Sequence, residues 1–147
     1  CEELPDATVA LVGPVADGSL ASRLASIPNL QMREPVGRTE VPGLVHSADV
    51  CIMPHLDTPL TRAMSPLKIY EYLAAGRPVV ATRLGPTSDI DDKVLLVDPG
   101  DSAGFAAAVR KALEAGPASE AEREGFVEDN SWRPRFEQLW DLATAAG

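Results

Sequence analysis

Short runs of hydrophobic residues alternate along the chain with longer segments in which hydrophobic and polar positions are mixed. Each run has four to seven residues, is rich in β-branched side chains and stops at or near Gly or Pro, which is typical of strands. Several runs are continuously apolar instead of alternating, as expected for a parallel sheet covered on both faces. The predicted strands are residues 8–12, 30–36, 49–53, 78–82 and 94–97.

Helical spacing marks the segments between and after these strands. One helix is predicted from a cap at Asp101 and Ser102 to a stop at Gly116. Two C-terminal helices are predicted over 119–129 and 132–146, and Trp132 and Trp140 of the second are expected in the core or an interface. The alternation predicts an α/β fold: a Rossmann-like, doubly wound parallel sheet of about five strands in three α/β/α layers. Such sheets bind ligands at the carboxyl ends of their strands.

Length and composition agree with one globular domain over residues 1–147. The 22 acidic and 13 basic residues give a net charge of −9, which argues against nucleic acid or an anionic membrane as a partner. A transmembrane segment and a signal pattern are not predicted, so a cytoplasmic location is expected. Cys1 and Cys51 are expected to be free thiols, with Cys51 buried in its apolar run.

The densest signal lies in residues 64–80. Ser65 is predicted to cap a helix, Pro66 to occupy its first position and Gly76 to end it. The predicted apolar face of this helix consists of Leu67, Tyr70, Leu73 and Ala74.

Lys68 is unusual in this helix, because a cation near the N-terminus opposes the helix dipole at a cost of about 0.3–1 kcal/mol. A bound phosphate would reverse that effect, since helix N–H groups and the ammonium would converge on it. Glu71, three residues on, could accept hydrogen bonds from two ribose hydroxyls. The alternative is a Lys68–Glu71 surface pair worth a few tenths of a kcal/mol. The residues alone leave both interpretations open.

The segment 65–80 carries the signature S-P-L-K-x-x-E-Y-L-A-A-G-x-P-V-V. With it, nearly the whole chain resembles the C-terminal, nucleotide-sugar donor-binding domain of retaining bacterial glycosyltransferases of GT-B architecture, of the group 1 type. The supporting stretches are 11–14, 41–44, 48–50, 54–55, 60–61, 105–109 and 130–132 with Arg135.

This resemblance implies a hexosyl transfer from a nucleoside-diphosphate sugar, such as a UDP-sugar, with no cofactor and no metal site. Glu71 would hold the ribose and Lys68 would act catalytically by stabilising the leaving diphosphate. His55 follows a strand end, where it could donate to a phosphate or sugar hydroxyl. The other donor-binding residues are expected to be Ser65, Pro66 and Leu67 at the helix tip, Gly37 and Arg38 beside the base, and Gly13 at a strand end.

Two departures from the family pattern stand out. Ala63 occupies the position where many related enzymes carry a second glutamate directed at the transferred sugar. The usual first β-α unit and the N-terminal acceptor domain are expected to be missing, so the chain alone is expected to be inactive. The flank of the strand that begins at Thr8 would then be exposed and could support a homo-oligomer.

Several alternatives remain. A non-catalytic nucleotide-binding or assembly module and half of a nucleotide-sugar epimerase would share the same architecture. A phosphorylation receiver is rejected, because Gly13-Pro14 and Pro54-His55 stand where it needs aspartates. The cluster Asp89, Asp91 and Asp92 is interpreted as a solvated loop in preference to a metal site. Thr82 and Arg83 have either a donor-facing or a surface role, and His46 is expected at the surface.

Overall fold

The computed structural model describes residues 1–87, 90 and 93–145 and divides into two compact units, 1–44 and 45–147. Each unit is described by itself. The predicted acidic loop at Asp89, Asp91 and Asp92 lies outside the described residues.

The first unit contains two parallel strands joined by one helix. Its elements are β1 (Val9–Val12), α1 (Gly18–Ala25) and β2 (Leu30–Arg33), and the helix α2 (Val41–His46) spans the boundary with the second unit. The strand register runs from Val9 opposite Leu30 to Val12 opposite Arg33. Asp17 caps α1 by accepting hydrogen bonds from the Ser19 hydroxyl and backbone N–H and the Leu20 N–H, which lowers the pKa of its carboxyl group.

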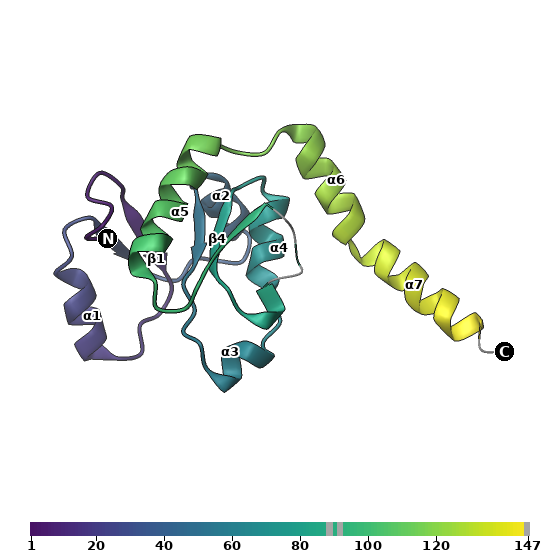
Figure 1. Cartoon of the computed structure of the whole chain (residues 1–147), viewed down its shortest axis with the longest axis horizontal. Helices are drawn as coiled ribbons and strands as arrows, with labels where there is room; N and C mark the ends of the chain where they lie inside the picture. Colours follow the sequence, from purple (N-terminus) through teal and green to yellow (C-terminus); the bar gives the residue numbers. More distant parts are fainter. Residues whose placement is uncertain (88–89, 91–92, 146–147) are drawn as a thin grey trace. The chain divides into compact units, whose positions relative to one another are not determined.

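The second unit is built on three parallel strands in the order β3-β4-β5. Figure 1 shows α4 and α5 on opposite sides of β4, as a doubly wound arrangement requires. The elements of this unit are β3 (Cys51–Met53), α3 (Pro59–Ala63), α4 (Leu67–Ala74), β4 (Val79–Thr82), the 3₁₀ turn η1 (Gly85–Thr87), β5 (Val94–Val97), α5 (Ser102–Ala115), α6 (Glu120–Asn130) and α7 (Trp132–Thr144).

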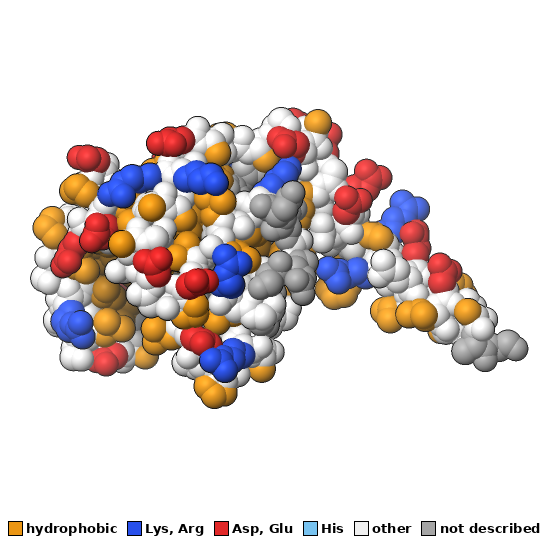
Figure 2. Space-filling view, in the orientation of Figure 1, with side chains coloured by type: hydrophobic (Ala, Val, Ile, Leu, Met, Phe, Trp, Pro, Cys, Tyr) orange, Lys and Arg blue, Asp and Glu red, His pale blue; other side chains and the backbone are white. Residues whose placement is uncertain are grey.

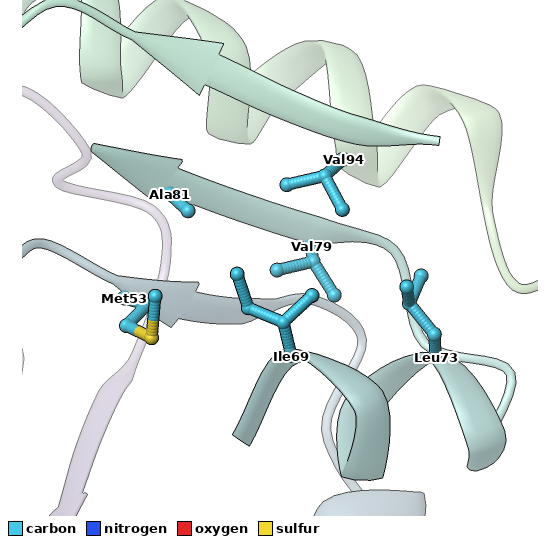
Figure 3. Packing of buried hydrophobic residues seen from close by; sticks show 6 residues of the cluster. All are labelled: Met53, Ile69, Leu73, Val79, Ala81 and Val94. Atoms are coloured by element: carbon cyan, nitrogen blue, oxygen red, sulfur yellow. The ribbon is translucent and has the colours of Figure 1, made fainter. Parts of the chain in front are cut away.

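The core of the second unit lies between α4 and the sheet. Ile69 and Leu73, one helical turn apart, project from α4 onto the strands (Figure 3). Every residue of β4 is buried, as its continuously apolar sequence predicts. The cluster consists of Met53, Ile69, Leu73, Val79, Ala81 and Val94.

The predicted α/β class is confirmed, and all five predicted strands are present and parallel. They form one sheet of two strands and one of three among the described residues. The prediction that the strands are covered on both faces of the sheet does not hold for β1 and β2, because Leu11 and Met32 stay partly exposed. A two-stranded sheet with one helix cannot cover both of its faces.

The predicted start and apolar face of the 65–76 helix need correction. α4 begins at Leu67, one residue later than expected, with Pro66 at the cap position (φ −85°, ψ 64°) instead of Ser65. Leu67 is 67% exposed, whereas Ile69, which the predicted face omitted, is fully buried. The reason is that α4 is covered on two sides, by the sheet and by α6, so its buried surface is wider than one stripe.

The C-terminal helices form where predicted; the tryptophans of α7 do not lie in a core, so the interface placement that the sequence also allowed stays a prediction. Trp132 is 87% exposed and Trp140 60% exposed. Figure 2 shows hydrophobic side chains along one side of α7. On this helix, Phe136 and Trp140 stack on each other with ring centroids 6.1 Å apart.

Cys1 and Cys51 are free thiols, and Cys51 is buried, as expected.

Candidate functional site

The predicted site of the second unit lies at the carboxyl edge of its sheet. Parallel strands all end at the same edge, so the residues after β3, β4 and β5 share it. Ile69 packs near the strand ends at Met53 and Ala81, whereas Leu73 lies toward the opposite end of the sheet (Figure 3). The N-terminus of α4 therefore points to the carboxyl edge, where ligands bind in folds of this kind.

The tip of α4 presents backbone N–H groups. The Leu67 N–H donates to the Ser65 carbonyl and the Ile69 N–H to the Pro66 carbonyl, each at 3.0 Å. Among the described residues, the Lys68 N–H meets no acceptor. Because Pro66 at the cap has no polar side chain, the Lys68 N–H lacks the acceptor that a serine cap would supply. The predicted side-chain cap at Ser65 is therefore wrong, and the tip is left with positive electrostatic character.

Lys68 and Glu71 form an ion pair on the exposed side of this tip. The Lys68 Nζ lies 2.7 Å from Glu71 Oε2, and the two side chains are 57% and 52% exposed. The hydrogen bond that the ammonium donates to Glu71 raises the pKa of Lys68 above its ordinary value, so the ammonium stays charged. The surface pair that the sequence left open is thus formed in this structure. The same contact holds a cation and a carboxylate side by side at the carboxyl edge.

His55 lies in the loop that follows β3 at the same edge. Its N–H donates to the Met53 carbonyl at 3.0 Å, and its side chain is partly buried. The loop continues into α3, where Thr58 and Thr61 form a capping box and the Arg62 guanidinium donates to both oxygens of Asp57, at 2.5 and 2.7 Å. Ala63, the last residue of α3, is exposed and supplies no polar group.

Three predicted residues belong to the first unit, and the structure does not bring them together with Lys68 and Glu71 in one unit. Gly13 follows β1 with φ +137°, a conformation that favours glycine, and its N–H donates to the Arg33 carbonyl at the end of β2. The Gly37 N–H donates to Glu40 Oε2 at 2.9 Å, and Arg38 is exposed. Both glycines thus follow strand ends at one sheet edge.

Arg83 has the surface role that the sequence allowed. Its Nε donates to Asp98 at 2.9 Å and its Nη2 to the Leu96 carbonyl at 3.1 Å, while Thr82 is buried. These contacts border a shallow groove between β5 and α5, which also reaches Lys111. Sequence reasoning missed it, because its lining is spread over three segments of the chain. Within the described part of the chain, groups of three or more His, Cys, Asp or Glu residues that could hold a metal ion are absent.

Comparison with known proteins identifies the family. Residues 1–115 match the sequence model described as "Glycosyl transferases group 1". The chain belongs to this family. The matched range contains α4 and every predicted donor-binding residue, whereas α6 and α7 lie beyond it.

Two individual proteins are similar to this group 1 glycosyltransferase chain. "Putative teichuronic acid biosynthesis glycosyltransferase TuaH" of Bacillus subtilis (strain 168) is 34% identical over 141 residues, which cover 92% of this chain and 36% of TuaH. The crystal structure of AviGT4, a glycosyltransferase involved in avilamycin A biosynthesis, superposes with a TM-score of 0.64 at 22% identity, covering 92% of this chain and 43% of AviGT4. The second likeness supports a GT-B-type fold. The chain thus spans little more than a third of the curated relative's length.

None of the helices in the described residues combines the length and the apolar character that crossing a membrane requires.

Proposed function

We propose that this chain is the donor-binding part of a glycosyltransferase that transfers a hexosyl group from a nucleoside-diphosphate sugar, such as a UDP-sugar. The observation that carries the proposal is the Lys68–Glu71 pair at the N-terminal tip of α4, within the range that matches the glycosyltransferase family. The family match also favours a transferase over the epimerase alternative.

The side chains of Lys68 and Glu71 bind different parts of the donor. Glu71 has a second carboxylate oxygen, Oε1, besides the one that contacts Lys68, so it can accept hydrogen bonds from both hydroxyls of a ribose. Lys68 has three ammonium protons, so it can keep its contact with Glu71 while it donates to a phosphate oxygen. The ion pair therefore holds the ammonium and the carboxylate close enough together to bind the same ligand.

The chemistry follows from charge. When the bond between the sugar and the diphosphate breaks, negative charge builds up on the leaving phosphate. The ammonium and the backbone N–H of Lys68 at the tip of α4 stabilise that charge more in the transition state than in the bound donor. Ser65, Pro66 and Leu67 supply backbone and shape around the diphosphate, and His55 donates to a phosphate or sugar hydroxyl.

The acceptor is held by another part of a longer, cytoplasmic protein, so the chain of 147 residues alone transfers no sugar. A separate acceptor-binding part agrees with the finding that the match to this chain covers 36% of the length of TuaH. Turnover of a UDP-sugar by the isolated chain would contradict it.

Titration calorimetry with UDP and with inorganic pyrophosphate tests the division of the donor, with GDP and ADP in parallel to identify the base. Glu71→Ala should weaken UDP about tenfold or more and leave pyrophosphate unchanged, because its contact is with the ribose. Lys68→Gln should weaken both ligands. The matched control is Glu114→Ala, an exposed glutamate on α5 that should leave both affinities unchanged.

The proposal is overturned if none of the three nucleoside diphosphates binds at millimolar concentration. Equal losses for Glu71→Ala and Glu114→Ala would also contradict it, because the carboxylate would then have no local role.

A further inference from the structure

The side of α4 that faces away from the sheet packs against α6 and is also contacted by one residue of α7. The rings of Tyr70 and Phe126 lie 6.3 Å apart between centroids, which joins α4 to α6. The guanidinium carbon of Arg135, on α7, lies 5.8 Å from the centroid of the Tyr70 ring. Tyr70 is thus contacted by both helices that lie beyond the family match.

Tyr70 stands between Lys68 and Glu71 in the sequence of α4. Ile69 fixes this turn of the helix to the sheet, and Tyr70 fixes it to α6 and α7. α4 has only eight residues and lacks a side-chain cap, so it is too short to hold its own geometry. Contacts from outside the helix therefore set the direction in which Lys68 and Glu71 point.

The opposite end of α4 is anchored to the same C-terminal region. The Ala118 N–H donates to the Gly76 carbonyl at 2.9 Å, directly before α6 begins. Further along α6, the Asn130 side chain donates to the Phe126 carbonyl at 3.0 Å and fixes the backbone that carries the Phe126 ring. The α6–α7 segment thus holds α4 near its C-terminus at Gly76 and near its N-terminus at Tyr70.

We propose that Arg135, through its contact with the Tyr70 ring, which packs beside Phe126, is a positioning residue that sets the orientation of the α4 tip. The effect on donor affinity rests on the proposed function. The orientation of the tip itself does not, so it can be measured without any ligand.

The test compares two arginines of the same helix. Arg135→Gln removes the contact with Tyr70, whereas Arg133→Gln removes an exposed arginine that pairs with Glu137, 3.5 Å away on α7. In ligand-free protein, Arg135→Gln should shift the amide ¹H–¹⁵N resonances of Lys68 and Glu71, and Arg133→Gln should leave them in place. UDP affinity should fall two- to fivefold for Arg135→Gln alone, the range expected for an exposed cation–π contact.

Two further variants separate positioning from general destabilisation. Arg135→Lys keeps a cation over the ring and should restore both the resonances and the affinity. In a Tyr70→Leu background, Arg135→Gln should produce no further change, because the contact through which it acts is already absent.

Three results would overturn the proposal: unchanged Lys68 and Glu71 resonances in Arg135→Gln, the same change in Arg133→Gln, or an undiminished Arg135→Gln effect in the Tyr70→Leu background. If the wild-type chain binds no nucleoside diphosphate, the proposed function fails, while the ligand-free spectra still decide whether Arg135 orients the tip.

Discussion

The ammonium of Lys68 and the carboxylate of Glu71 lie 2.7 Å apart, with the cation at the positive end of an eight-residue helix. A lysine at that position opposes the helix dipole, and Glu71 offsets part of the cost. The pair is exposed, so its net contribution to stability is small. An arrangement that gains little in folding but holds a cation and an acceptor at the ligand edge of the sheet is better explained by binding.

Replacing Lys68 should therefore separate binding from stability. Lys68→Gln should weaken UDP binding by about 10- to 100-fold, the loss expected for a hydrogen bond to a charged phosphate. Its free energy of unfolding should stay within about 0.5 kcal/mol of the wild type, because the lost ion pair and the relieved dipole repulsion offset each other. Calorimetry and urea unfolding measure the two quantities. A destabilisation above 1 kcal/mol would show that Lys68 is structural.

Ile69 anchors α4 to the sheet, so replacing it should lower the free energy of unfolding of the second unit. Ile69→Ala should cost about 2–5 kcal/mol of unfolding free energy, because this fully buried side chain packs between α4 and the strands. Leu67→Ala, two residues earlier and 67% exposed, is the matched control and should change stability by less than about 0.5 kcal/mol. Equal effects in urea unfolding would contradict the observed orientation of α4.

Glu122 should make the start of α6 sensitive to acid. Hydrogen bonds from the Ser119 hydroxyl and backbone N–H, together with Lys93, lower the pKa of Glu122 from 4.5 to about 2. Because the folded pKa lies below the unfolded one, the stabilisation is complete above pH 4.5 and is lost as the pH falls toward 2.

Glu122→Gln should remove this part of the pH dependence, and Glu124→Gln, two residues along the same helix, should retain it. The carboxyl ¹³C resonance of Glu122 followed from pH 6 to pH 2 gives the folded pKa directly. A midpoint near 4.5 would disprove the capping contacts.

The thiol of Cys51 should be unreactive in the folded protein. Burial raises its pKa to about 11, against a smaller opposing effect of the Arg77 guanidinium. At pH 8 only about one molecule in a thousand would carry the thiolate. A Cys1→Ser variant, which keeps Cys51 as its single thiol, should react with a disulfide reagent only after denaturation. Rapid reaction in native buffer would show that β3 is open to solvent.

The strands were the most predictable part of the fold. Residues 79–82 and 94–97 form strands because their apolar, β-branched runs are long enough to cross a covered sheet and end at Gly or Pro. Asp101 and Ser119 cap α5 and α6 as their side chains predict. The exact start of α4 was not predictable, because Pro66 suits both a first-turn and a cap position and the backbone of this loop decides between them.

The site was predictable in its residues and less so in its surroundings. Lys68 and Glu71 are adjacent because helical spacing brings residues three apart together, which the sequence alone shows. The contact between Arg135 and Tyr70 joins residues 65 positions apart, and spacing gives no sign of it. The sequence also left open whether Trp132 lies in the core or at an interface, because a helical apolar stripe shows which side needs cover and not what supplies it; its exposure excludes the core.

The most direct test of the account is a set of intermolecular nuclear Overhauser effects in a complex of UDP with the isotopically labelled chain. The account predicts contacts between the ribose H2′ and H3′ protons and the Glu71 side chain, and between the α4 tip and the ligand. Contacts to the groove between β5 and α5, near Arg83 and Lys111, with none to Glu71, would contradict it.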